Sequence, residues 1–206
     1  MTEFPYVIVD VFADAPLHGN PLAVVFDADG LSGAQMAALG REFNLSETAF
    51  ILKPRDPAHT AQVRIFTPME EVPFAGHPNI GAAFALARHA KLPSDDLAFD
   101  ELAGLVRLRL MRESGAIVGA SLQAPQTLTT QPAPGPEVFA AALSITLQDV
   151  VTTTHEPLIA TVGLPFAFVE LESLEALGRI RVHVPAFDKV RDRGILAIHA
   201  YVKEPT

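Results

Sequence analysis

The chain has 206 residues, 49% hydrophobic and 19% charged, which suits one large or two small globular domains. Its 15 Lys and Arg against 24 Asp and Glu give a net charge of -9. The basic residues do not form a run, so we expect no nucleic-acid partner. Without a basic leader region or an apolar stretch near the roughly 18 residues of a membrane span, we expect a soluble, cytoplasmic protein that does not bind membranes.

The N-terminal region predicts two strands followed by a helix. Residues 6–12 are rich in β-branched and aromatic side chains, and residues 21–26 repeat that character after a turn. The pattern Ser-x-x-Gln at 32–35 is typical of a capping box, and apolar residues then recur at helical spacing over 36–43. We therefore expect a helix of about three turns there.

Two further strands are predicted at residues 48–52 and 62–66, with a proline-containing loop at 54–57 between them. Glu47 therefore lies where the first helix gives way to a strand. Glu70 and Glu71 are expected in a solvated turn.

Residues 80–87 are apolar on every side, so a helix there must be wrapped by other elements. Pro78 suits the first position of that helix, which is expected to begin immediately after His77. Strands around it would form a sheet curled over a central helix. Later strands of the same unit are predicted at residues 98–100, 105–111 and 119–124.

A second unit follows a segment rich in Thr, Gln, Pro and Gly, which predicts a linker at 126–136 between a first domain at 1–125 and a second at 137–206. A helix at 137–143 and a strand at 149–153 faintly echo the earlier helix and strand, which hints at duplication. Further strands are predicted within 159–169 and 194–202. No second all-apolar helix follows before Thr206, so the second domain looks incomplete.

Glu47 and His77 are candidates for one acid/base site. Apolar residues after Glu47 favour partial burial, which raises the pKa of a carboxyl toward a range useful for proton transfer. His77 stands between Gly76 and Pro78 at a helix N-terminus, where N–H groups attract a substrate carboxylate and favour a neutral imidazole. The alternatives are a solvated glutamate at a strand start and a histidine in a capping turn.

Other chemistry is limited by the composition. The chain contains no Cys, which excludes disulfides and thiolate nucleophiles, and its histidines show no metal-ligand spacing, so we expect no metal. No dinucleotide fingerprint, phosphate loop or serine nucleophile motif occurs, which argues against nucleotide cofactors and serine hydrolysis. Asn20 and Ser46 are candidate ligand-binding residues, although both types are common in turns.

Four motifs, in this order, resemble the phenazine-biosynthesis PhzF-like protein family. They are Val9-Asp10-Val11-Phe12, Gly19-Asn20-Pro21-Leu22-Ala23-Val24-Val25, Asn44-Leu45-Ser46-Glu47-Thr48, and Phe66-Thr67-Pro68 with Pro73-Phe74-Ala75-Gly76-His77-Pro78. The likeness extends to Gly163-Leu164-Pro165-Phe166 and so covers essentially the whole chain.

This resemblance implies an α+β, diaminopimelate-epimerase-like fold of two similar domains, each a curled, mostly antiparallel sheet around a central helix, with the active site between them. It implies a homodimer and a cofactor-independent isomerase that moves a proton within a small carboxylate-bearing substrate, as in isomerisation of a dihydro-hydroxyanthranilate. By likeness Glu47 is the catalytic acid/base, His77 assists it, and the Gly76 backbone approaches the substrate.

Members of the family also carry an Asp-Pro-Ala-Thr-Gly-Ser type motif and a second central helix, and neither occurs here. Either residues beyond Thr206 supply them or a partner covers the gap. The resemblance therefore predicts an isomerase, with a non-catalytic small-molecule-binding or protein-interaction member as the alternative and a structural partner subunit as a third possibility.

Overall fold

The computed structural model describes residues 3–124, 126–162 and 164–203. The chain divides into two compact units, Met1–Pro125 (unit 1) and Gln126–Thr206 (unit 2). The predicted domain end at residue 125, and Gly163 of the last resemblance motif, lie outside the described residues. Within the described ranges, no helix is long and apolar enough to cross a membrane.

Unit 1 is an eight-stranded sheet with two α-helices. Its elements are β1 (Tyr6–Val11), β2 (Asn20–Val25), η1 (Ala28–Gly30), α1 (Gly33–Phe43), β3 (Glu47–Leu52), β4 (Ala61–Phe66), β5 (Glu71–Val72), α2 (Gly76–His89), β6 (Asp96–Glu101), β7 (Gly104–Glu113) and β8 (Ala116–Gln123). The strand order is β1-β2-β3-β4-β6-β7-β8, with β5 on β4. Only β2–β3 and β4–β6 pair in parallel. The strands and helices predicted for this region are confirmed.

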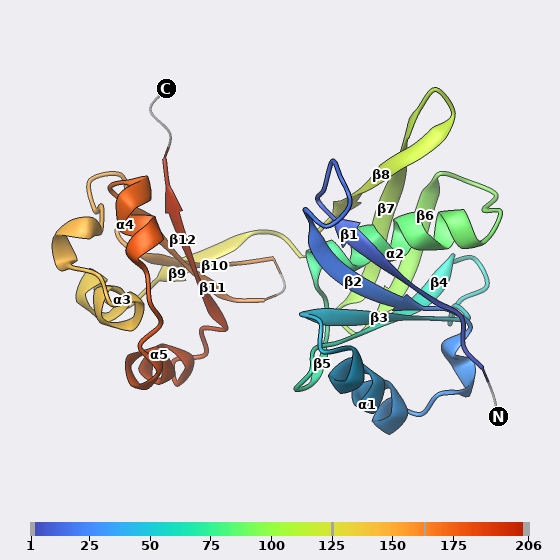
Figure 1. The fold of residues 1–206 in the computed structure, drawn as a ribbon, viewed down its shortest axis with the longest axis horizontal. Coiled ribbons are helices and arrows are strands. Elements are labelled where there is room, and N and C mark those ends of the chain that lie inside the picture. Colours follow the sequence, from blue (N-terminus) through green and yellow to red (C-terminus); the bar gives the residue numbers. More distant parts are fainter. Residues whose placement is uncertain (1–2, 125, 163, 204–206) are drawn as a thin grey trace. The chain divides into compact units, whose positions relative to one another are not determined.

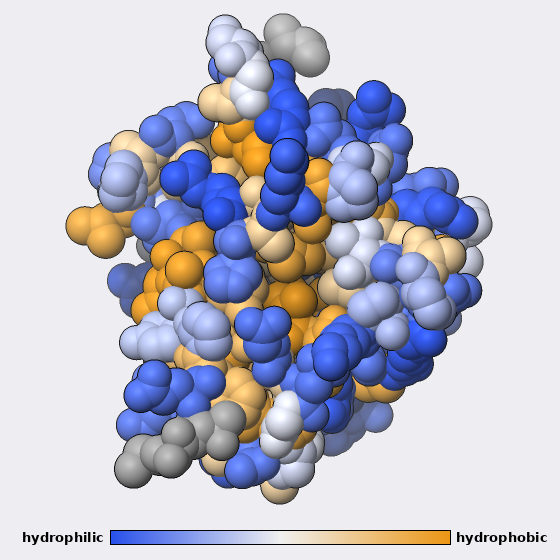
Figure 2. All heavy atoms as spheres, turned by 90° about the vertical axis from the view of Figure 1, so that its right-hand side faces the viewer, coloured by the Kyte–Doolittle hydropathy of each residue, from blue (hydrophilic) through white to orange (hydrophobic). Residues whose placement is uncertain are grey.

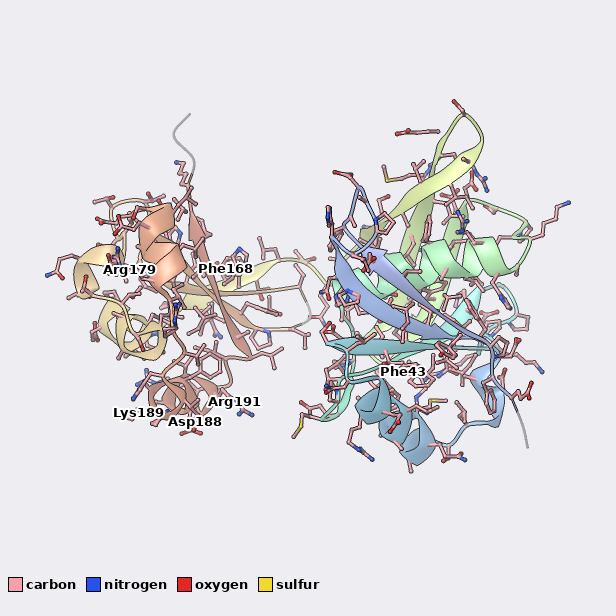
Figure 3. All side chains as sticks on the ribbon, in the orientation of Figure 1. Phe43, Phe168, Arg179, Asp188, Lys189 and Arg191 are labelled. Atoms are coloured by element: carbon pink, nitrogen blue, oxygen red, sulfur yellow. The ribbon has the colours of Figure 1, made fainter. Side chains whose placement is uncertain are left out.

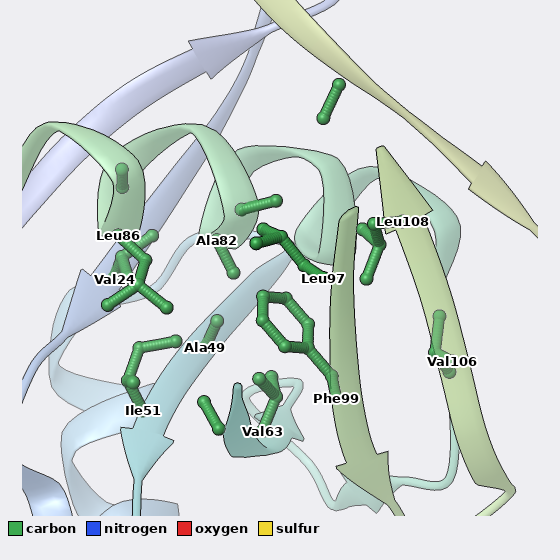
Figure 4. Close-up of a cluster of buried hydrophobic side chains, with 14 of the residues drawn as sticks. Val24, Ala49, Ile51, Val63, Ala82, Leu86, Leu97, Phe99, Val106 and Leu108 are labelled. Carbon is green, nitrogen blue, oxygen red and sulfur yellow. The ribbon is translucent and has the colours of Figure 1, made fainter. Parts of the chain in front are cut away.

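The sheet of unit 1 curls around α2, which runs through its hollow (Figure 1). Side chains from seven strands and from α2 form one core, and Phe99 and Ala82 are fully buried in it (Figure 4). Burying a side chain as large as that of Phe99 stabilises the fold by roughly 1.5–3 kcal/mol. The apolar helix predicted from residues 80–87 is therefore the centre of the unit, wrapped as expected.

The other face of the sheet carries α1. Ser32 caps this helix with the predicted capping box, in which Gln35 N–H donates to Ser32 Oγ at 3.3 Å and Ser32 N–H donates to Gln35 Oε1 at 2.9 Å. Met36 packs with Phe50 in a separate small core. Because side chains alternate along β3, Phe50 faces α1 whereas Ala49 and Ile51 face α2.

The curled sheet of unit 1 does not close into a barrel, because β1 and β8 are its two end strands. A cavity of about 300 Å³ opens between these strands over Ile80 and Phe84 of α2. Figure 2 shows one face of the molecule, where hydrophobic residues gather at the centre and hydrophilic residues surround them.

Unit 2 is a smaller sheet with helices on one face. Its elements are β9 (Thr129–Pro132), α3 (Pro136–Leu143), η2 (Leu147–Asp149), β10 (Leu158–Thr161), β11 (Phe166–Leu171), α4 (Leu174–Arg179), α5 (Val184–Arg191) and β12 (Ala197–Val202). The strand order is β12-β11-β10-β9. Buried residues of the three helices, including Phe139 and Val190, form one core with the β11 residues Ala167, Val169 and Leu171.

The helix α5 was not predicted, and its side chains explain how it packs. Asp188, Lys189 and Arg191 lie on its outer side (Figure 3), while Val190 is fully buried. In the described part of unit 2 no helix packs against the opposite sheet face, which carries Phe168, so no counterpart of α2 is present there.

Two predictions for this region need correction. The strand expected at 149–153 is wrong, because Thr146 N–H donates to Asp149 Oδ2 at 2.8 Å and folds residues 147–149 into a 3-10 turn. Only Val150 forms an isolated bridge, to Leu171. The predicted linker at 126–136 is not a free connection throughout, since residues 129–132 form β9 and pair with β10.

Candidate active site

Glu47 is the first residue of β3, placed there by the end of α1. Asn44 ends the helix in a left-handed conformation with φ 51°, which turns the chain toward the sheet. Glu47 then pairs in register with Leu22 of β2. Because it shares the strand face of Ala49 and Ile51, its side chain points to the side of the sheet that holds α2.

His77 is the second residue of α2, which begins at Gly76 after the N-cap residue Ala75. The prediction that the helix begins immediately after His77 is therefore wrong by two residues. Pro78 is tolerated as the third helical residue because N–H groups of the first turn have no partner within the helix. The imidazole is fixed to the helix itself rather than to a preceding loop.

The two side chains meet. His77 Nε2 lies 3.5 Å from Glu47 Oε2, and their side chains are 11% and 21% exposed. Both of these atoms are buried, and neither has a hydrogen-bond partner. Buried polar atoms are normally paired. His77 Nε2 and Glu47 Oε2 therefore face each other with unused hydrogen-bonding capacity.

A chain of two polar contacts fixes the imidazole. Ser46 Oγ–H donates to Asn20 Oδ1 at 3.1 Å, which orients the amide so that Asn20 Nδ2 faces His77 Nδ1 at 3.4 Å. An amide nitrogen only donates, so Nδ1 accepts and a neutral ring carries its proton on Nε2. The proton of His77 is therefore directed toward Glu47.

Burial lowers the pKa of His77 below its ordinary value, and the nearby Glu47 carboxylate opposes that shift. The imidazole is accordingly neutral at neutral pH. A neutral ring with Nε2–H toward Glu47 is a hydrogen-bond donor at that nitrogen.

Gly76 leaves open space above the helix N-terminus. A Cβ added there would meet nothing within 4 Å, whereas one added at Gly81 would lie 2.6 Å from Leu22 Cδ2. Gly81 is thus required for packing of α2 against the sheet, but Gly76 is not. Asn20 and Ser46 are also exposed, so the structure brings all five predicted site residues to one accessible end of α2.

The local support of this site includes groups that sequence reasoning missed. Glu71 is not in a solvated turn as expected. It lies in β5, where its carboxylate accepts from Arg64 Nε at 2.7 Å and Arg64 Nη2 at 2.6 Å. This bidentate pair raises the pKa of Arg64 and anchors the segment that leads into α2.

Asn79 and Glu101 were also missed, and both are buried, at 0% and 4% exposure.

The described residues contain no group of three or more His, Cys, Asp or Glu side chains that could hold a metal ion. The cavity between β1 and β8 is separate from the candidate site, because neither Glu47 nor His77 lines it.

A curled, mostly antiparallel sheet around a central helix defines a diaminopimelate-epimerase-like fold. Comparison with known proteins narrows that class, because residues 9–206 match the phenazine biosynthesis-like protein family, PhzC-PhzF. The chain belongs to this family.

Two curated relatives are isomerases by name. The chain is 39% identical over 193 residues to an uncharacterised isomerase of Mesorhizobium japonicum, covering 91% of this chain and 63% of that protein. It is 41% identical over 191 residues to the trans-2,3-dihydro-3-hydroxyanthranilate isomerase of Pseudomonas chlororaphis, covering 92% of this chain and 65% of that protein. The chain thus spans a little under two-thirds of either relative.

Among solved structures, a predicted epimerase from Pseudomonas aeruginosa superposes with a TM-score of 0.80 at 33% identity, covering 98% of this chain and 70% of that one. The likeness therefore includes both units and most of the relative's length.

Proposed function

We propose that the Glu47 and His77 site catalyses a cofactor-independent isomerisation, in which a proton moves within a small carboxylate-bearing substrate. The observation that carries the proposal is the pair of buried, unpartnered atoms, Glu47 Oε2 and His77 Nε2, 3.5 Å apart at an open helix end. Membership of a family whose relatives are isomerases supports the same reaction class.

In the proposed reaction Glu47 acts first as base and then as acid. Its carboxylate takes a proton from one carbon of the substrate, the electron pair of the broken C–H bond moves into the adjacent unsaturated system, and the protonated carboxyl returns the proton to another carbon. No oxidant or cofactor is needed, because atoms and electrons balance within the substrate. The neutral His77 donates its Nε2–H to the substrate as charge develops.

The substrate carboxylate is proposed to sit at the N-terminus of α2. The backbone N–H groups of Gly76 and His77 have no partner within this 14-residue helix, and the helix dipole favours an anion there. The absence of a side chain at Gly76 allows a close approach. Asn20 and Ser46 are exposed beside His77, so we place them among the groups that bind the substrate.

A second candidate is a non-catalytic small-molecule-binding or protein-interaction role. It is favoured by unit 2, whose described residues provide no helix against the sheet face that carries Phe168. We also propose, on family likeness, that the active form is a homodimer.

The test uses trans-2,3-dihydro-3-hydroxyanthranilate as the probe, because a relative's isomerase is named for it. Proton NMR in D₂O follows conversion by the wild-type chain and by Glu47→Gln, and a thermal shift reports binding. We expect conversion by the wild type, and binding without conversion by Glu47→Gln. Equal conversion by both would remove Glu47 from the chemistry, and binding without conversion by the wild type would favour the non-catalytic role.

A further inference from the structure

Glu101 is a buried acid that the proposed proton transfer does not use. It ends β6, is 4% exposed, and neither of its carboxyl oxygens has a hydrogen-bond partner. The turn after it is tied to the segment before α2, since Ala103 N–H donates to the Pro73 carbonyl at 3.0 Å. An unpaired ionised carboxyl in such a place is strongly unfavourable, so this acid requires an explanation.

Asn79 connects Glu101 to the active-site turn. Its side-chain amide lies beside the Glu101 carboxyl and lowers the pKa of that group, although no hydrogen bond joins the two side chains, and its Nδ2 donates to the Ala75 carbonyl at 3.0 Å. Ala75 is the N-cap residue of α2, and His77 lies two residues before Asn79 in the same turn. Asn79 is fully buried and its Oδ1 has no partner. Asn79 therefore lies between Glu101 and the turn that presents His77.

We propose that Glu101 is a positioning residue that acts through Asn79, holding the first turn of α2 and thereby His77 in place as long as its carboxyl is protonated. Three buried atoms lack partners, namely both Glu101 oxygens and Asn79 Oδ1. A protonated carboxyl can donate as well as accept, whereas an ionised one can only accept. The effect of Glu101 on catalysis rests on the proposed function, whereas its effect on the position of His77 does not.

The charge environment agrees with a protonated acid. Burial raises the pKa of Glu101 to about 8, and the Asn79 side chain only partly opposes that rise. Its register partner on β7 is Gly104, and neither residues 102–104 nor the segment 73–75, to which Ala103 is hydrogen-bonded, contains a titratable side chain. Asp100 is engaged elsewhere, with its Oδ1 2.8 Å from His59 Nδ1. On α2 the titratable group in the first turn is His77, which faces Glu47.

The test is the pH dependence of the ring nitrogens of His77, measured by NMR on ¹⁵N-labelled protein. The pKa of His77 is itself lowered, so its own titration is complete before Glu101 ionises. In the wild type we expect a second inflection near pH 8, the pKa of Glu101. Glu101→Gln keeps the size and the hydrogen-bonding capacity of the side chain but cannot ionise, so it should lack this inflection.

Asp96→Asn is the matched control, because Asp96 is an exposed carboxyl on the same strand, and it should keep the inflection. A wild-type protein without the inflection, or a Glu101→Gln variant that retains it, would overturn the proposal.

A second readout uses substrate conversion. Above pH 8 the kcat of the wild type should fall about tenfold per pH unit, and Glu101→Gln should abolish this fall. If no form converts the substrate but the inflection behaves as expected, the proposed function fails and the positioning role stands. If conversion depends on Glu47 but Glu101→Gln reproduces the wild-type pH profile, the positioning role fails alone.

Discussion

Units 1 and 2 share one arrangement of strands and differ in the elements around it. In unit 1, β1 and β2 are antiparallel, a helix follows, and β3 returns parallel to β2. In unit 2, β10 and β11 are antiparallel, α4 and α5 follow, and β12 returns parallel to β11. The two units therefore share this strand topology. The likeness lies in these elements and not in the helix at 137–143 and strand at 149–153 where the sequence hinted at duplication.

The residue pairs of the two parallel strand pairs, β2–β3 and β11–β12, show a chemical difference between the units. Glu47 pairs with Leu22 in unit 1, and the equivalent pair in unit 2 is Ala197 with Phe166. Unit 2 therefore has a methyl group where unit 1 has its candidate base. Unit 1 also continues into β4 and α2, and α2 supplies His77. A shared strand arrangement thus becomes a candidate active site only where the carboxyl and the central helix occur together.

The largest expected effect comes from the two cores. Phe99 in unit 1 and Phe139 in unit 2 are both fully buried, in separate clusters. Phe99→Ala and Phe139→Ala should each lower the free energy of unfolding of their own unit by about 3–5 kcal/mol. Denaturant titrations followed by residue-resolved NMR should show each variant shifting only one unit. If both variants shift all signals together, the units do not unfold separately.

Glu101 should make the stability of unit 1 depend on pH. Because its folded pKa, about 8, lies above its unfolded value, stability is lost as pH rises through the interval between the two. Relative to Glu101→Gln, the wild type should lose about 2–3 kcal/mol between pH 5 and pH 7. Urea titrations at the two pH values measure this. A difference between the two proteins that is the same at both pH values would contradict it.

Two glycines of α2 separate packing from ligand access. Gly81→Ala places a Cβ 2.6 Å from Leu22 Cδ2 and should destabilise unit 1 by about 1–3 kcal/mol. Gly76→Ala meets nothing within 4 Å and should change stability by less than about 0.5 kcal/mol while weakening substrate binding. Thermal denaturation and a binding titration distinguish the two. Undiminished binding by Gly76→Ala would move the substrate away from the helix end.

A more local effect concerns the imidazole of His77. Ser46→Ala removes the hydrogen bond that orients Asn20, at a cost of about 0.5–1.5 kcal/mol, and should lower the population of the His77 tautomer that is protonated at Nε2. Long-range ¹⁵N–¹H NMR spectra of the ring report the tautomer. An unchanged tautomer population would show that the orientation of the Asn20 amide does not depend on Ser46.

The order of elements in unit 1 could be predicted because its signals are local. A capping box marks the start of α1, and a helix apolar on all sides can only be a central one. The short helices α4 and α5 could not be predicted in this way, since α4 has six residues and α5 buries only Val190 completely. A turn forms at residues 147–149 in place of the predicted strand, because the Asp149 side chain accepts hydrogen bonds from the N–H and the hydroxyl group of Thr146.

The candidate site was predictable in part. The motifs around Glu47 and His77 identified both residues, but their 3.5 Å contact results from the packing of α2 in the curled sheet. Glu101 left a weak signal, because the alternation of β6 buries Leu97 and Phe99 and so places Glu101 on the same inward face. The position of Asn79 beside Glu101 depends on tertiary packing, which local patterns do not contain.

The most direct test of the account is the uptake of solvent deuterium into the substrate by three proteins, the wild type, Glu47→Gln and Glu170→Gln. Glu170 is the buried glutamate of unit 2, where it accepts a hydrogen bond from Thr154 Oγ1 at 3.3 Å. We predict that Glu47→Gln abolishes uptake and that Glu170→Gln retains it. Uptake by Glu47→Gln at the wild-type rate would contradict the assignment of proton transfer to the unit 1 site.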